Sequence, residues 1–300
     1  MSFKKTAIAL GSFDGLHRGH MSVIACALEF QKERGFSPVV LLFDSHPMQI
    51  LRGRAPDKIL QNSLRDEIIK QTGAEICIIS FAEIKDMSCH EFFEEILIKK
   101  LNAGGVCCGM NYRFGKGNEG GCEELGRLCG EFGVELKVAP SVDYGGEPVS
   151  STRIRNAVEN GEIPLANAML GRSFLYRLTV VSGYHRGRLI GAPTINQRFE
   201  KGFVIPKKGV YASSTLVDGR LYPSVTNIGL RPSFENEDFR SETCILGFSG
   251  DLYGREIEVR LTEYLRNEIK FDSIDALSAQ IHADAEKSEK IFNREGENHV

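Results

Sequence analysis

Short apolar runs alternate with amphipathic segments through the first 171 residues, and this alternation constrains the fold more than any other feature of the chain. Five such runs are separated by segments with helical periodicity. Strands that alternate with helices along a sequence form parallel sheets, because each helix carries the chain back to start the next parallel strand. We therefore predict an α/β domain with a doubly wound parallel sheet. The expected strands cover residues 6–10, 38–43, 75–80, 106–109 and 135–139, and the expected helices cover residues 20–34, 64–71, 90–101 and 122–132.

The pattern changes after about residue 171, where β-rich segments with partial alternation follow one another. Asp218-Gly219 stands between two of them and is typical of a two-residue type I′ hairpin turn. Consecutive strands joined by short turns predict a small antiparallel β-barrel. The expected strands cover residues 174–181, 210–217, 221–228, 243–248 and 256–261.

Residues 273–292 have helical periodicity, and we expect this helix to pack on the barrel through one apolar stripe. From residue 294 onward we expect a frayed tail. The chain is thus predicted to hold two domains, an α/β domain over residues 1–171 and a barrel domain with a C-terminal helix over residues 172–300. The stripe consists of Ile274, Leu277, Ile281 and Ala285.

Composition excludes several classes of protein. The chain has 37 Lys and Arg against 40 Asp and Glu, a formal charge of −3, which gives no electrostatic reason to bind a nucleic acid. Its eight cysteines contain no C-x-x-C pair, so we expect reduced thiols, a cytoplasmic location and no zinc site. No apolar stretch approaches the ~18 residues of a membrane helix. The oligomeric state is left open.

A glycine-rich turn, GSFDGLHRGH over residues 11–20, follows the first expected strand and opens the first expected helix. Glycines let a backbone approach an anion closely, a helix N-terminus offers unpaired N–H groups, and His17 and His20 add donors that can carry charge. The turn therefore predicts a phosphate site. Taken singly, such a turn more often only reverses the chain and binds no ligand, and a surface histidine is more often solvated than functional.

Three other polar turns follow expected strands, and ligands in such sheets bind beyond the carboxyl ends of the strands. They cover residues 43–47, 109–117 and 148–155. Ser151 and Thr152 are good N-cap residues, and Arg155 in the same segment could hold phosphate oxygens. All four turns could converge at one edge of the sheet.

Two familiar phosphate motifs fail in the second of these turns. Glycines 115, 117 and 120 match the dinucleotide fingerprint, but they do not follow the first strand and lack an acidic partner at the expected distance. The P-loop spacing also fails, because Gly117 stands where a Ser or Thr should ligate magnesium. We expect a flexible loop here.

In the second half, a glycine- and arginine-rich stretch, GYHRGRLIGAPTIN over residues 183–196, could wrap a polyphosphate. Its glycines and cations suit phosphate, and Thr194 and Asn196 supply neutral oxygens suited to magnesium. The plainer interpretation is that Pro193-Thr194 forms a turn and that Glu242, which we expect to open a strand, is a solvated strand end. The phosphate-binding candidates in this stretch are Gly183, Arg188, Gly191, Thr194 and Asn196.

Together these residues resemble a known family. Residues 11–20 are similar to the G-x-F-D-G-x-H-x-G-H signature of the nucleotidyltransferase superfamily, whose two histidines bind a triphosphate and stabilise its transition state. Residues 43–47, 111–115 and 150–155 resemble, in order and spacing, further motifs of bacterial FAD synthetase, the adenylyltransferase module of the bifunctional riboflavin kinase/FAD synthetase family. The resemblance implies that Asn111 and Arg113 bind flavin. It implies that ATP and its phosphates are bound by Gly11, Phe13, Asp14, Gly15, Ser151, Thr152 and Arg155, with His17 and His20 as catalytic groups.

The resemblance continues into the second half. PTIN over residues 193–196 resembles the P-T-A-N motif of riboflavin kinases, which implies that Thr194 and Asn196 contact magnesium and ATP, and Glu242 falls on the catalytic base of that family. Residues 227–234, 251–254 and 265–266 also match. Ala192 and Gln197 replace the usual large apolar residues beside the motif, and we expect them to alter packing near the nucleotide. Ile195, Cys244 and Gly247 also depart from the family pattern.

The resemblance implies an enzyme of flavin cofactor synthesis that phosphorylates riboflavin to FMN in its C-terminal domain and adenylylates FMN to FAD in its N-terminal domain. ATP with Mg²⁺ is the implied co-substrate, and flavins are substrates and products. Two alternatives stay open at this point. Only one module, most plausibly the adenylyltransferase, is active, or the chain is a flavin-binding protein without turnover.

Overall fold

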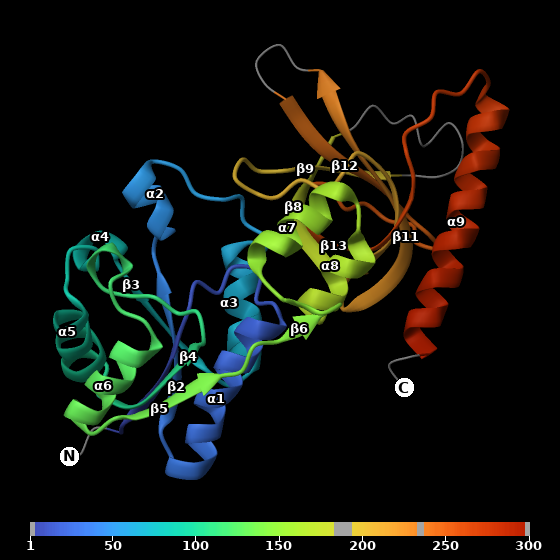
Figure 1. Cartoon of the computed structure of the whole chain (residues 1–300). Helices are drawn as coiled ribbons and strands as arrows, with labels where there is room; N and C mark the ends of the chain where they lie inside the picture. Colours follow the sequence, from blue (N-terminus) through green and yellow to red (C-terminus); the bar gives the residue numbers. More distant parts are fainter. Residues whose placement is uncertain (1–3, 183–193, 233–236, 298–300) are drawn as a thin grey trace. The chain divides into compact units, whose positions relative to one another are not determined.

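The structure is a computed structural model that describes residues 4–182, 194–232 and 237–297 (Figure 1). The chain forms two compact units. The first consists of Met1–Lys58 and Asn62–Ser151, and the second consists of Ile59–Gln61 and Thr152–Val300. Each unit is described by itself. The division of the two activities after residue 171 stays a prediction.

The first unit is built on a five-stranded parallel sheet in the order β3-β2-β1-β4-β5, which confirms the predicted doubly wound sheet. The chain adds β2 and β3 on one side of β1 and then returns to add β4 and β5 on the other. The strand order therefore reverses between β1 and β4, the position at which such sheets bind ligands. The strands are β1 (Thr6–Leu10), β2 (Ser37–Phe43), β3 (Glu75–Ile79), β4 (Ala103–Gly109) and β5 (Glu135–Ala139).

Two glycines end helices of this unit, directly after the last residues of the expected helices 20–34 and 122–132, where a glycine is a typical stop signal. Gly35 ends α1 with φ 73°, and Gly133 ends α6 with φ 65°, a left-handed conformation that glycine adopts without strain. The helices of this unit are α1 (Arg18–Arg34), α2 (Pro47–Arg52), α3 (Asn62–Gln71), α4 (Phe81–Ile84), α5 (Cys89–Glu91) and α6 (Cys122–Phe132), with a π-helix η1 (Phe92–Lys100) and a 3₁₀ turn η2 (Lys116–Asn118).

Two elements of this unit differ from the prediction. The helix expected over residues 90–101 is split, with α5 followed by the π-helix η1. β4 begins at Ala103 and not at residue 106, because Gly104 and Gly105 belong to the strand. A Cβ at either glycine would come within 2.8 Å of the ring of Phe36 or Phe30, so the small residues let these rings pack against the sheet.

The apolar core of the first unit lies on both faces of the sheet. Ile8 and Leu10 of β1 join a buried cluster that includes Leu97 of η1 and Leu125 of α6. α1 packs against β1 and β4, and its Phe30 lies over the strand at Gly105. The sheet is thus buried between helices, as the apolar runs of its strands require.

The second unit contains a closed antiparallel barrel in the order β10-β11-β12-β9-β8-β13, which confirms the predicted barrel. Asp218 and Gly219 have φ 50° and 81° between paired Val217 and Arg220, the conformation of a type I′ turn. The strands are β8 (Phe174–Val181), β9 (Thr194–Arg198), β10 (Gly209–Val217), β11 (Arg220–Pro232), β12 (Glu237–Ile245) and β13 (Glu256–Arg266).

Two barrel strands differ from the prediction. The segment from Thr194 to Arg198 is the strand β9, although we expected a turn or loop there. β12 begins at Glu237, six residues before the predicted start, so Glu242 lies within the strand and does not open it. The charged start of β12 is tolerated because buried Asp238 pairs with Arg198 of β9 at 2.8 Å.

Short elements lie between β5 and β8 in the chain. α7 (Ser151–Asn160) begins at one of the candidate N-cap residues, while α8 (Ile163–Leu170) of the second unit and the small hairpin of β6 (Asp143–Tyr144) and β7 (Glu147–Pro148) in the first unit were not predicted. The side chain of Gln61 donates to the carbonyl of Arg177 at 2.7 Å and accepts from its N–H at 2.7 Å. These two bonds tie residues 59–61 to β8.

The C-terminal helix α9 (Ile274–Glu297) lies against β10 and β11 (Figure 1) and continues to Glu297, so the tail expected from residue 294 is helical. The predicted apolar stripe is only partly correct, because Ile274 is 69% exposed. The most buried residues of α9 in the described part of the chain are polar. Asp284 accepts from Arg266 of β13 at 2.7 Å, and Ser288 donates to the carbonyl of Ser224 at 2.6 Å.

We predict that Asp284→Ala destabilises the protein by about 3–5 kcal/mol, because it leaves the largely buried guanidinium of Arg266 without its carboxylate. Urea unfolding measures this loss. The matched control is Glu263→Ala, which removes an exposed ion pair with Arg294 between the same strand and the same helix and should cost less than about 1 kcal/mol. Equal losses in the two variants would contradict the role assigned to the buried pair.

Candidate active sites

The turn between β1 and α1 has a strained backbone. Phe13 and Leu16 have φ 51° and 43°, values that residues other than glycine adopt rarely, and Gly15 has φ 78°. Phe13 is fully buried, so its ring holds the turn in place. The hydroxyl of Ser151, the first residue of α7, donates to the carbonyl of Asp14 at 3.1 Å. The structure thus brings one residue of the distant 148–155 segment onto this turn, as predicted.

His17 and His20 lie together at the N-terminus of α1. Their rings stack with centroids 3.7 Å apart, and Nδ1 of His17 caps the helix by accepting from the N–H of His20 at 3.3 Å. Because Nδ1 is an acceptor, neutral His17 carries its ring proton on Nε2. A Cβ at Gly19 would come 3.2 Å from the His17 ring, which explains the glycine between the two histidines.

His20 is neutral at pH 7 in the free protein. Burial lowers its pKa well below the usual value, and the charge of neighbouring His17 lowers it further. Its Nδ1 is buried and has no hydrogen-bond partner among the described residues. A buried ring nitrogen without a partner at a helix N-terminus is suited to receive a ligand group.

The loop after β4 leaves the sheet beside this turn, because β1 and β4 are adjacent parallel strands. Its predicted flavin-binding residues Asn111 and Arg113 are both exposed. The loop expected to be flexible forms a closed turn, since Phe114 and Gly120 exchange two backbone hydrogen bonds at 3.1 and 3.0 Å. This pairing fixes the chain directly after the exposed residues Asn111 and Arg113.

The remaining candidates near this turn come from residues 148–155 and 43–47. Thr152 is exposed and Arg155 is half-buried, and both belong to the second unit, so their approach to the turn stays a prediction. After β2, Asp44 accepts from the N–H of Phe81 at 3.2 Å, and the hydroxyl of Ser80 is the main cause that lowers the pKa of Asp44. His46 caps α2 by accepting from the N–H of Met48 at 3.1 Å.

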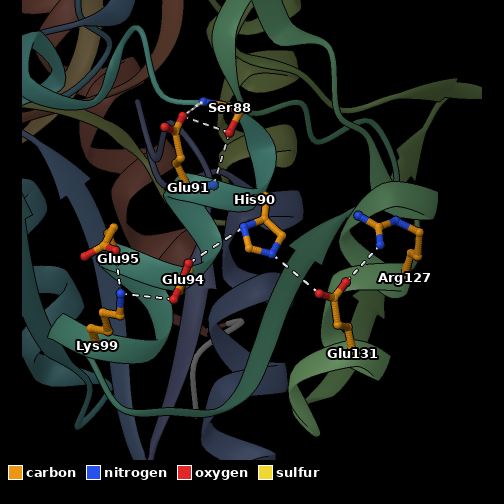
Figure 2. A network of polar contacts seen from close by, with 8 residues as sticks. All are labelled: Ser88, His90, Glu91, Glu94, Glu95, Lys99, Arg127 and Glu131. Atoms are coloured by element: carbon orange, nitrogen blue, oxygen red, sulfur yellow. Dashed lines mark hydrogen bonds and ion pairs between the residues drawn. The ribbon is translucent and has the colours of Figure 1, made fainter.

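Another histidine of this unit lies in a surface network. His90 is 3.8 Å from Glu94 and 3.5 Å from Glu131, which also pairs with Arg127 at 2.9 Å (Figure 2). These side chains are about half exposed, so the network contributes little stability. Because its contacts are these surface ion pairs, His90 is a control for His17 and His20.

The candidate kinase residues lie on one face of two adjacent strands. Asn196 of β9 is directly opposite Glu242 of β12, and Thr194 is opposite Cys244, two residues further along. Opposed residues of antiparallel strands point to the same face with Cβ atoms about 5 Å apart. The structure thus brings Thr194, Asn196 and Glu242 together. The other candidates in this stretch, Gly183, Arg188 and Gly191, lie outside the described residues.

Sequence reasoning missed a further polar residue on this face. Asn227 of β11 is directly opposite Glu242 on the side away from Asn196. Its side chain donates to Glu268 at 3.1 Å. Asn227 belongs to a segment that resembles the family, but only the register of β11 against β12 places it beside Glu242.

Gln197 corrects another expectation. It is fully buried and donates to the carbonyls of Leu178 at 2.6 Å and Ile257 at 2.7 Å, inside the barrel. Because it follows Asn196 in the strand, it faces away from Glu242. Gln197 therefore replaces apolar packing in the barrel interior and not beside the candidate kinase face. Ala192 lies outside the described residues.

The donor set on the kinase face fits Mg²⁺ and not zinc. Thr194 and Asn196 offer neutral oxygens, the ligands that a hard cation takes when substrate phosphates supply the remaining charge. Among the described residues, no group of three His, Cys, Asp or Glu could hold a metal by itself. In the same part of the chain, no helix is long and apolar enough to cross a membrane.

Two family models match the chain in succession. Residues 1–153 match the model described as FAD synthetase, and residues 170–292 match the model described as riboflavin kinase. The first match contains the turn with His17 and His20. The second contains Thr194, Asn196 and Glu242.

Characterised relatives match over nearly the whole chain. A bifunctional riboflavin kinase/FMN adenylyltransferase of Bacillus subtilis is 32% identical over 96% of this chain and 93% of its own length, and one of Escherichia coli is 32% identical over 95% and 92%. A crystal structure described as a macrolide-efflux protein of Streptococcus pneumoniae has a TM-score of 0.88 and 31% identity, covering 96% of this chain and 95% of that one. This chain therefore belongs to the family of bifunctional riboflavin kinase/FMN adenylyltransferases.

Proposed function

We propose that Glu242, Asn196 and Thr194 carry out the phosphorylation of riboflavin and that the turn with His17 and His20 carries out the adenylylation of FMN. Membership of the family assigns both reactions to the chain, one to each matched half. The observation that supports the residue assignment is the cross-strand pair of Asn196 and Glu242, in which the proposed base is directly opposite a proposed ligand of metal and phosphate.

In the kinase reaction, Glu242 takes the proton from the ribityl 5′-hydroxyl of riboflavin as that oxygen attacks the γ-phosphate of ATP. The product is FMN. Glu242 is half-buried, so its carboxylate can meet a substrate while it stays fixed by the strands on both sides. Gly183, Arg188 and Gly191 are proposed to wrap the ATP phosphates.

Magnesium is proposed to enter this site with ATP. Thr194 and Asn196 would hold it through their side-chain oxygens. When bound, Mg²⁺ neutralises the negative charge of the phosphates.

In the adenylyltransferase reaction, a phosphate oxygen of FMN attacks the α-phosphate of a second ATP, pyrophosphate leaves and FAD forms. A phosphate monoester is already anionic at neutral pH, so this step needs no protein base. His17, His20 and the N–H groups at the start of α1 position the triphosphate and stabilise its developing charge.

Further residues are proposed around the same turn. Asn111 and Arg113 bind the flavin, and Ser151, Thr152 and Arg155 bind ATP phosphates together with the backbone of residues 11–15. The free thiols of all eight cysteines support a reducing, cytoplasmic location.

Replacing the proposed base separates the two reactions. We predict that Glu242→Gln lowers the rate of FMN formation roughly 10²–10⁴-fold, because the attacking hydroxyl keeps its proton, while FAD formation from supplied FMN survives. Chromatography of the flavins measures both rates. Glu256→Gln, an exposed glutamate of β13, is the control and should keep both activities. Loss of both activities in Glu242→Gln would refute the division of labour.

The converse variant tests the other site. His17→Ala with His20→Ala should abolish FAD formation and leave FMN formation at the parental rate, since the two histidines serve only the triphosphate of the second reaction. His90→Ala, the surface histidine of Figure 2, should leave both reactions unchanged. A double variant that still makes FAD at the parental rate would rule out the proposed role.

ATP binding should also draw a proton to His20. The ring is neutral near pH 7 because its pKa is lowered, and an adjacent triphosphate favours the imidazolium form and raises that pKa. Calorimetric titration of ATP in two buffers with different ionisation enthalpies measures the proton uptake. We expect uptake in the wild-type protein that is reduced in His20→Ala. The same uptake in both proteins would contradict a contact between His20 and phosphate.

A further inference from the structure

The proposed base has a polar neighbour on each side. Asn196 and Asn227 are both directly opposite Glu242, one on β9 and the other on β11. All three side chains therefore point to the same face of the barrel wall. Asn196 is already assigned to metal and phosphate, whereas nothing above assigns a ligand to Asn227.

The amide of Asn227 has a defined orientation. Its Nδ2 donates to Oε1 of Glu268 at 3.1 Å, and an ionised carboxylate only accepts, so the opposite end of the amide must be the oxygen. This Oδ1 is buried and has no hydrogen-bond partner in the described part of the chain. Buried acceptors in native proteins are almost always paired, with protein, water or a ligand.

A glycine keeps this orientation possible. Gly229 lies two residues after Asn227 on the same face of β11, and a Cβ there would come 2.7 Å from Oε1 of Glu268. A side chain at this position would make the carboxylate of Glu268 shift from its present place. Glu268, Gly229 and Asn227 thus form one arrangement that presents Oδ1 beside Glu242.

The hydroxyl groups of the substrate indicate which donor this acceptor binds. Riboflavin presents a polyol chain whose terminal hydroxyl goes to Glu242, so the next hydroxyl of the chain is a donor held one carbon away. Phosphate and metal lie on the side of Asn196, which leaves Asn227 on the side of the flavin. Building on the proposed role of Glu242, we infer that Oδ1 of Asn227 accepts a hydrogen bond from the ribityl 4′-hydroxyl and that Glu268 is the residue that positions Asn227.

A double-mutant cycle between protein and substrate tests this contact. The substrates are riboflavin and its 4′-deoxy analogue, and the enzymes are wild type and Asn227→Ala. We expect wild type to favour riboflavin roughly 10- to 100-fold in kcat/KM, because the analogue leaves a buried acceptor unpaired. Asn227→Ala should use the two substrates within about two-fold of each other, with the KM for ATP unchanged.

Two further variants separate this contact from a general effect on the fold. Glu268 is exposed, so Glu268→Gln should fold normally, and because it loosens the orientation of Asn227 it should lower the preference for riboflavin several-fold. Val225→Ala, on the same strand and face but opposite Cys244, should keep the full preference. Binding of riboflavin and of its 4′-deoxy analogue can be measured by the quenching of flavin fluorescence. The preference for riboflavin should rank the variants in the same order without turnover.

Several results would overturn the inference. Asn227→Ala that prefers riboflavin as strongly as wild type would exclude the hydroxyl contact. A variant whose defect is relieved by excess Mg²⁺ or ATP would make Asn227 a ligand of metal or nucleotide instead. If wild type forms FMN and Glu242→Gln does not, the proposed base stands. Either of the two results just named then contradicts only the Asn227 contact. If Glu242→Gln keeps its activity, the proposed base is wrong, and the fluorescence cycle still decides the contact.

Discussion

A slip of one residue between β9 and β12 would turn Asn196 away from Glu242, because successive side chains of a strand point to opposite faces. The candidate kinase face therefore depends on the register of three neighbouring strands, with Asn196, Glu242 and Asn227 in one row across them. Closure of the barrel fixes this register, since every strand is paired on both sides. Asp238, paired with Arg198, adds a buried ionic contact between the same two strands.

The same register puts the candidate functional residues on one face of the strands and buried barrel residues on the other. Asn196 and Glu242 face one side, while their chain neighbours Gln197 and Ser241 face the barrel interior and are fully buried. The side-chain Nε2 of Gln197 donates there to two backbone carbonyls. A substitution that departs from the family pattern next to the motif thus changes the interior of the barrel and leaves the row of candidate residues intact.

The proposed adenylyltransferase site depends on a different constraint, the strained turn after β1. The buried Phe13 ring and the hydrogen bond from Ser151 maintain the positive φ values at Phe13 and Leu16, and this backbone places His17 at the N-cap of α1 and His20 in its first turn. Burial there keeps His20 neutral without a ligand. We therefore expect the protonation of His20 to respond to the negative charge of a triphosphate.

Much of this arrangement could be predicted from local sequence signals. The apolar runs predicted the parallel sheet, glycines 35 and 133 predicted two helix ends, and Asp218-Gly219 predicted a hairpin. β9 was missed because Asn196 and Gln197 are both polar and both buried, which removes the alternation that marks a strand. The anchor of α9 was missed for a similar reason, since Asp284 and Ser288 look like surface residues until their partners are known.

Long-range pairing explains the remaining failures. Asn227 lies 15 residues from Glu242 in sequence, and nothing in either segment says that the two are opposed. The two histidines were found because they sit within one turn, whereas the stacking of their rings and the lowered pKa of His20 depend on burial that only the fold creates.

A chain of this family with two separate sites makes FAD from riboflavin and two molecules of ATP. To test this, purified protein is incubated with riboflavin, Mg²⁺ and ATP labelled either in the γ- or in the α-phosphate, and the flavins are separated over time. We expect the γ-label to appear first in FMN and then in FAD, and the α-label to appear only in FAD. Riboflavin that stays unchanged, or an α-label in FMN, would contradict it.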